Sequence, residues 1–147
     1  MKRFVPIVEH PFELLIGLLF LLNGLALTLG AGPPASLNAT LPAALVWAWG
    51  AVQFFAGGLI VVGIVIRYLK PALLVVGFRL ERAGLWPLAA AAAVYGVVAV
   101  SYAGARALYP VSVLVAVAAA CIARAVAVGR LEKTILRHTQ GGPIGDE

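Results

Sequence analysis

The segment Ala43–Ile66, AALVWAWGAVQFFAGGLIVVGIVI, decides the fold, because it carries no charged residue across 24 positions. A helix of about 20 apolar residues spans the hydrocarbon core of a bilayer, so this segment is long enough to cross one. The whole chain has the same character: of its 147 residues, 63% are hydrophobic and 12% are charged, and the mean hydropathy is +1.02. A soluble domain is typically about 25% charged. The composition therefore predicts an integral membrane protein.

Three further segments have no charge over a comparable length: Leu14–Gly32, Ala83–Ala105 and Ala107–Ala123. The last is extended by Arg124, whose long side chain can reach the headgroups from near a helix end. We expect an all-α fold, an integral bundle of four transmembrane helices in a single domain over residues 1–138. The expected spans are about residues 12–31, 43–66, 84–104 and 108–128, followed by a flexible cytoplasmic tail at 139–147.

The distribution of lysine and arginine predicts the orientation. Ten of the eleven cations flank the expected spans on one side, and Arg106 alone lies on the other. Because short loops rich in Lys and Arg stay in the cytoplasm, we expect both termini there, in a multi-pass protein of the cytoplasmic membrane. The net charge of +5 then reflects topology and attraction to anionic lipid, not nucleic-acid binding. A cleaved signal peptide is the competing interpretation of the start, but Glu9 and Glu13 interrupt the approach to a long apolar run.

Two segments on the cytoplasmic side are too short and too charged to cross the membrane. Pro71–Arg82 joins the second and third spans, and a mixed apolar and charged segment follows Gly129. We expect both to lie along the interface as short amphipathic helices.

Small residues recur at helical spacing. In lipid no hydrophobic force drives helices together, so association depends on close packing, which small residues allow. The third span has one such stripe and the fourth has another, and we expect these two stripes to face each other in a hairpin. The second span has a shorter stripe of two glycines with Gln53 between them. The expected helix-packing residues are Gly50, Gly57, Ala92, Gly96, Ala99, Ala103, Ser112, Ala116, Ala119 and Ala123.

Three polar side chains fall at similar depths inside the expected spans. Counted from the cytoplasmic helix ends at 1.5 Å per residue, Asn23 lies about 14 Å deep, Gln53 about 20 Å and Tyr95 about 17 Å. An amide without a partner in hydrocarbon is costly, so we expect Asn23 and Gln53 to bond each other across neighbouring helices. Two interpretations of this polar cluster stay open: a clasp that fixes helix register, or the lining of a pore or small ligand site.

The residue types that catalysis and coupled transport need are scarce in the expected spans. Glu13 stands at the first turn of the first span, where a carboxylate is commonly a capping charge, and Arg124 is near an end. Paired carboxylates, thiol pairs and phosphate-binding glycine loops are not recognisable, and Cys121 is expected to be a packing residue. We therefore expect no enzyme, no cofactor and no metal site, and ion-coupled transport is disfavoured.

The order of these features resembles small membrane proteins of actinobacterial phages, some of which are assigned as holins. The resemblance rests on Glu9-His-Pro-Phe-Glu-Leu-Leu-Ile-Gly17, on an alanine-filled third span after Glu81-Arg-Ala-Gly-Leu-Trp86, and on the basic finish from Arg130 to Arg137. It implies a self-associating protein that permeabilises the membrane in phage lysis. Two alternatives remain: an accessory or structural subunit of a larger membrane complex, and a carrier or channel for an uncharged small solute. The expected partners are the lipid bilayer and either copies of the same chain or other membrane proteins.

Overall fold

The computed structural model describes residues 11–30, 32–33 and 35–140, and these residues form helices joined by short connections, with no strand among them. The predicted N-terminal charges Lys2, Arg3 and Glu9 lie outside the described residues, as do residues 141–147 of the predicted tail. The all-α prediction is confirmed. The elements are α2 (Pro11–Thr28), α3 (Ala35–Thr40), α4 (Ala43–Leu69), the short 3-10 helix η1 (Pro71–Leu73), α5 (Leu74–Ala103), a second 3-10 helix η2 (Gly104–Ala107) and α6 (Leu108–Gln140).

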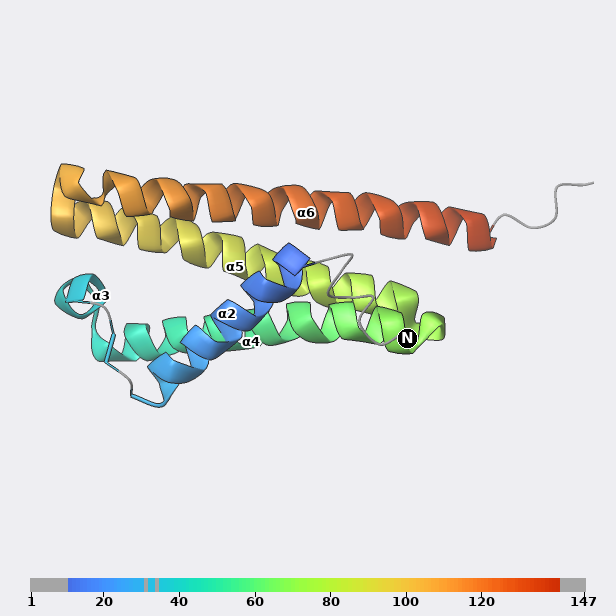
Figure 1. The fold of residues 1–147 in the computed structure, drawn as a ribbon, viewed down its shortest axis with the longest axis horizontal. Helices are drawn as coiled ribbons and strands as arrows, with labels where there is room; N and C mark the ends of the chain where they lie inside the picture. The colour runs from blue at the N-terminus through green and yellow to red at the C-terminus, as the bar shows by residue number, and fades with distance from the viewer. Residues whose placement is uncertain (1–10, 31, 34, 141–147) are drawn as a thin grey trace, which may run out of the picture.

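The long helices pack in chain order, α2 on α4, α4 on α5 and α5 on α6. In Figure 1, α5 and α6 run side by side as a long hairpin, while α2 crosses α4 obliquely. The hairpin reverses at Gly104, whose φ of 56° lies in the left-handed region that glycine adopts without strain. Among the described residues, three helical stretches are long and apolar enough to cross a membrane: Pro11–Thr28, Ala43–Leu69 and Pro71–Arg137, the last of which contains the whole hairpin.

The central segment is not a separate interfacial helix, contrary to the prediction. After the single turn η1, residues 74–82 form the first turns of α5, which continues without a break to Ala103. Gly77 makes this possible, because a Cβ there would lie 2.7 Å from the carbonyl oxygen of Gly63 on α4. The two backbones therefore pack directly against each other, and the charged residues of the segment lie against α4 and α6.

The predicted second interfacial helix is also part of a longer element. Helix α6 runs through Gly129 to Gln140, so it includes the first two residues of the predicted tail. Glu132 lies on the side of α6 that faces α5 and is 8% exposed. This buried carboxylate keeps the end of α6 docked on the start of α5.

The closest contacts between helices occur at glycines, and in each of them α4 is one of the two helices. A Cβ at Gly57 would be 2.5 Å from the carbonyl oxygen of Gly17 on α2, and one at Gly50 would be 2.8 Å from the Leu27 side chain. Both glycines were predicted to be packing residues, and both are buried at the interface of α2 and α4. The core beside them is apolar, with Ile60, Ile64, Leu88, Cys121 and Ala125 as buried members. The position of Cys121 agrees with the packing role expected for it.

The predicted hairpin stripes do not face each other. On α5, Ala92, Gly96 and Ala99 are buried and Ala103 is exposed, whereas on α6 all of Ser112, Ala116, Ala119 and Ala123 are exposed. The buried face of α6 includes Ala118, Cys121, Ala125, Val128 and Glu132. That face is displaced by two residues from the predicted stripe, and two residues turn an α-helix by about 200°. Pairing of α6 through the predicted stripe is therefore wrong, because the stripe points away from α5.

The contact at Gly96 is also looser than the stripe predicts. A Cβ there would meet only a Val111 methyl group at 3.6 Å, an ordinary van der Waals distance. The backbones of α5 and α6 therefore do not need a glycine at this position.

Candidate functional site

The two amides form the bond that their depths predict. Asn23 Nδ2 on α2 donates to Gln53 Oε1 on α4 at 2.5 Å. The Gln53 side chain is buried, while Asn23 is exposed although it points toward α4. Glycines above and below this level bring α2 and α4 close enough for two short amide side chains to meet. The bond joins a buried polar group to one on the bundle surface.

A cavity of about 180 Å³ lies beside this bond and is lined by all three members of the predicted polar cluster. Tyr95 reaches it from α5, and its ring packs against Trp49 with centroids 6.4 Å apart. Apolar side chains of α2 and α6 and the buried Leu37 of α3 complete the walls. The geometry thus brings Asn23, Gln53 and Tyr95 to one small, mostly apolar space with two amide groups at its edge.

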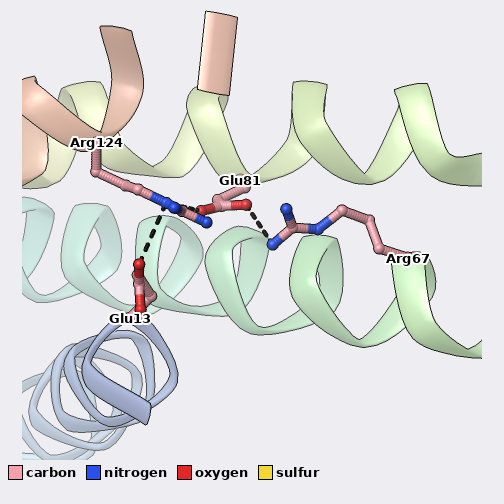
Figure 2. Close-up of polar contacts among 4 residues, drawn as sticks. All are labelled: Glu13, Arg67, Glu81 and Arg124. Carbon is pink, nitrogen blue, oxygen red and sulfur yellow. Dashed lines mark hydrogen bonds and ion pairs between the residues drawn. The ribbon is translucent and has the colours of Figure 1, made fainter. Parts of the chain in front are cut away.

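A second polar feature was not predicted: a network of ion pairs that joins all four long helices (Figure 2). Glu81 on α5 lies at its centre, and its side chain is 0% exposed. One carboxylate oxygen of Glu81 accepts a hydrogen bond of 2.8 Å from Arg124 Nε on α6, and the other lies 2.6 Å from Arg67 Nη2 on α4. Arg124 Nε also lies 3.3 Å from Glu13 Oε1 on α2.

The two arginines of this network differ in their surroundings. Arg67 has a side-chain exposure of 6%, and its guanidinium carbon lies 4.6 Å from the centre of the Phe78 ring. Its Nε makes no hydrogen bond with the described residues. Arg124 is 25% exposed at its side chain, so it lies at the edge of the network. We expected Arg124 to extend to the headgroups, but it turns inward because Glu81 and Glu13 provide its countercharge.

The network is balanced in charge, with two carboxylates for two guanidinium groups. Burying a charge is costly unless an opposite charge accompanies it, and removing one partner from such a group leaves the others uncompensated. Glu81 alone serves two arginines from two different helices. Its arrangement can therefore tie α4, α5 and α6 together at one level, while Glu13 adds α2.

The sequence predicts other roles for two residues of this network. Glu81 belongs to the segment Pro71–Arg82, which is expected to lie along the interface, and Glu13 is expected to be a capping charge. One signal could have found them: Arg124 lies within an otherwise apolar segment, and an ionisable group in such a segment needs a partner. Glu81, between Arg79 and Arg82, is one of the few carboxylates expected on the same side.

A separate ion pair joins α5 and α6 at the end of the hairpin opposite to its turn. Arg79 Nε on α5 donates to Glu132 Oε1 on α6 at 2.7 Å, and Arg82 Nη1 lies 3.9 Å from the other carboxylate oxygen. The Arg79 side chain is 64% exposed, so this pair is accessible to solvent in a way that Glu81 is not.

Comparisons of the chain with protein-family models, with curated proteins and with solved structures give no match.

Proposed function

We propose that this chain is a membrane protein of four transmembrane helices, with both termini in the cytoplasm, that self-associates and permeabilises the cytoplasmic membrane in the manner of a holin. The topology is supported by helix length. At 1.5 Å per residue, α5 and α6 are about 45 and 50 Å long, and each exceeds a hydrocarbon core of about 30 Å. The cations that end α4, begin α5 and end α6 lie at one end of the bundle, and Arg106 lies at the other.

The single observation that carries self-association is the outward face of α6. Ser112, Ala116, Ala119 and Ala123 are exposed on the side of α6 opposite to its contact with α5. Small residues on a lipid-facing helix surface allow a second helix to approach closely, which is the main source of helix association in membranes. No helix in the described part of the chain packs on this face, so a second copy of the chain is the partner that we propose for it.

Permeabilisation is the activity that fits such an assembly. Asn23 bonds Gln53 but is exposed on α2 near the middle of the predicted span, and the polar atoms of its amide that this bond does not use are unfavourable in lipid. In an assembly of several copies, this amide would face a neighbouring protomer or a water-filled opening. Membrane leakage through such an opening requires no catalytic residue and no coupling ion.

The test is membrane depolarisation after induced expression, measured with a potential-sensitive dye. The full chain should depolarise cells, and Ala119→Leu should abolish or strongly delay this because a larger side chain blocks the approach of a second α6. Val113→Leu is the matched control, since Val113 is 53% exposed about a quarter turn away from the stripe. The proposal fails if the chain does not depolarise cells, or if Ala119→Leu and Val113→Leu behave alike at equal amounts of folded protein. An accessory or structural subunit then becomes the better description.

A specific observation favours a second function, a carrier or channel for an uncharged small solute. The cavity of about 180 Å³ beside Asn23, Gln53 and Tyr95 has the size and the amide groups that a small polar molecule needs. Uptake of radiolabelled glycerol into proteoliposomes tests it. If the cavity carries the solute, Gln53→Leu should lower glycerol uptake while crosslinked oligomers persist. A holin-like pore should instead pass larger dyes as well as glycerol, and Gln53→Leu should then reduce the leakage of both probes together.

A further inference from the structure

A groove of about 240 Å³ on the outside of the hairpin collects positive charge near the cytoplasmic end of the bundle. We call it the basic groove. Arg82 and Trp86 line it from α5, and Gly129, Arg130 and Lys133 line it from α6. Ala125 and Val126 form its wall on the side toward the middle of the bundle. Neither the ion network at Glu81 nor the cavity at Asn23 shares any of these residues.

The charge of this region is unbalanced. Among the described residues that line the basic groove there are three cations and no carboxylate. Glu132 is the neighbouring carboxylate, but its Oε1 accepts a hydrogen bond of 2.7 Å from Arg79 Nε, and its Oε2 lies 3.9 Å from Arg82 Nη1. One carboxylate thus serves a region that also contains Arg79, Arg82, Arg130 and Lys133. The excess of positive charge favours an anion in the basic groove.

Gly129 shapes the site for Arg82. A Cβ at this position would lie 3.3 Å from Arg82 Nη1, so the guanidinium group rests directly over the backbone of α6. A larger residue would push Arg82 away from Arg130 and Lys133. A planar guanidinium group held in this way can donate two parallel hydrogen bonds to a phosphate.

Trp86 and the apolar wall point to the kind of anion. Trp86 is 46% exposed, and an indole ring prefers the boundary between headgroups and acyl chains. Basic pockets between helices on the cytoplasmic side of a membrane are suited to anionic lipid headgroups. We propose that the basic groove binds the phosphate group of an anionic phospholipid of the cytoplasmic leaflet, with its acyl chains along Ala125 and Val126. This inference rests on the proposed membrane placement but not on permeabilisation.

Native mass spectrometry of the full chain in neutral detergent tests the proposal with phosphatidylglycerol as the probe and phosphatidylcholine as the comparison. The intact chain should retain phosphatidylglycerol and not phosphatidylcholine. Arg130→Gln and Lys133→Gln should each lower the affinity by about fivefold. Gly129→Leu should lower it as well although it removes no charge, because it displaces Arg82. Circular dichroism of each variant checks that the helices are intact.

Lys70→Gln is the control, because Lys70 is an exposed cation on the same side of the bundle and outside the basic groove. Its affinity for phosphatidylglycerol should be unchanged. Equal losses for Lys70→Gln and Arg130→Gln would overturn the proposal, since attraction would then depend on total charge alone. Inorganic phosphate is the second probe. If it displaces phosphatidylglycerol at equal concentration, and Arg130→Gln weakens both, the groove recognises phosphate but its ligand is the free ion and not the lipid.

Discussion

Arg124 on α6 donates a hydrogen bond of 2.8 Å to Glu81 on α5, and the carboxylate that accepts it is completely shielded from solvent. The second oxygen of Glu81 lies 2.6 Å from Arg67 on α4. One carboxylate therefore fixes the rotation of α6 on α5 and the position of α5 on α4. The same contact sets which face of α6 is turned outward, and this face carries the proposed function.

Glu81→Gln should destabilise the bundle strongly. The variant leaves the buried Arg67 and the partly buried Arg124 without their shared countercharge, and breaking a buried pair in this way costs about 3–5 kcal/mol. We expect a large loss of stability in detergent unfolding followed by circular dichroism. Glu132→Gln is the comparison, and it should cost clearly less because its partner Arg79 is mostly exposed. Similar losses for the two variants would show that Glu81 has no special structural role.

Gly57→Ala and Gly96→Ala should have opposite effects. A Cβ at Gly57 would lie 2.5 Å from backbone atoms of α2, which cannot move without separating the helices, so we expect a loss of about 1–3 kcal/mol. A Cβ at Gly96 meets only a Val111 methyl group at 3.6 Å, and alanine is the better helix former, so we expect a gain of about 0.5 kcal/mol. Unfolding in detergent measures both, and destabilisation by Gly96→Ala would contradict the packing described for α5 and α6.

The proposed topology makes a separate prediction. An alkaline phosphatase reporter, which is active only outside the cytoplasm, should be inactive when fused after Arg137 and active when inserted after Arg106. The reason is that the cations at the end of α4, the start of α5 and the end of α6 are retained in the cytoplasm. Strong activity after Arg137 would contradict four spans with both termini inside.

Part of this arrangement could be predicted from the sequence. Uncharged segments of sufficient length locate the apolar helices, since the thickness of a bilayer sets the length that is needed. Counting residues from the helix ends places Asn23 and Gln53 at similar depths, and they form a hydrogen bond. Gly50 and Gly57 are contact residues because a helix with glycines at this spacing can pack closely on its neighbour.

The rotation of α6 could not be predicted in the same way. This helix has alanine or another small residue on several faces, so the spacing of small residues does not single out one of them. The face of α6 that packs on α5 is decided by two ion pairs, Arg124 with Glu81 and Glu132 with Arg79. These pairs involve residues far apart in sequence, and the charges near Glu81 looked like those of an exposed loop. Recognising them requires knowing that α5 starts at Leu74, seven residues before Glu81.

Disulfide crosslinking through α6 in native membranes tests the central claim most directly. The measurement uses Ala119→Cys in a Cys121→Ala background, and the wild-type chain with its buried Cys121 is the control. A disulfide forms only where Cα atoms come within about 7 Å, so it reports the close approach that small residues permit. We predict that oxidation gives a covalent dimer of the Ala119→Cys chain and none of the wild-type chain. If Ala119→Cys stays monomeric while Val113→Cys in the same background forms dimers, self-association through the outward face of α6 is contradicted.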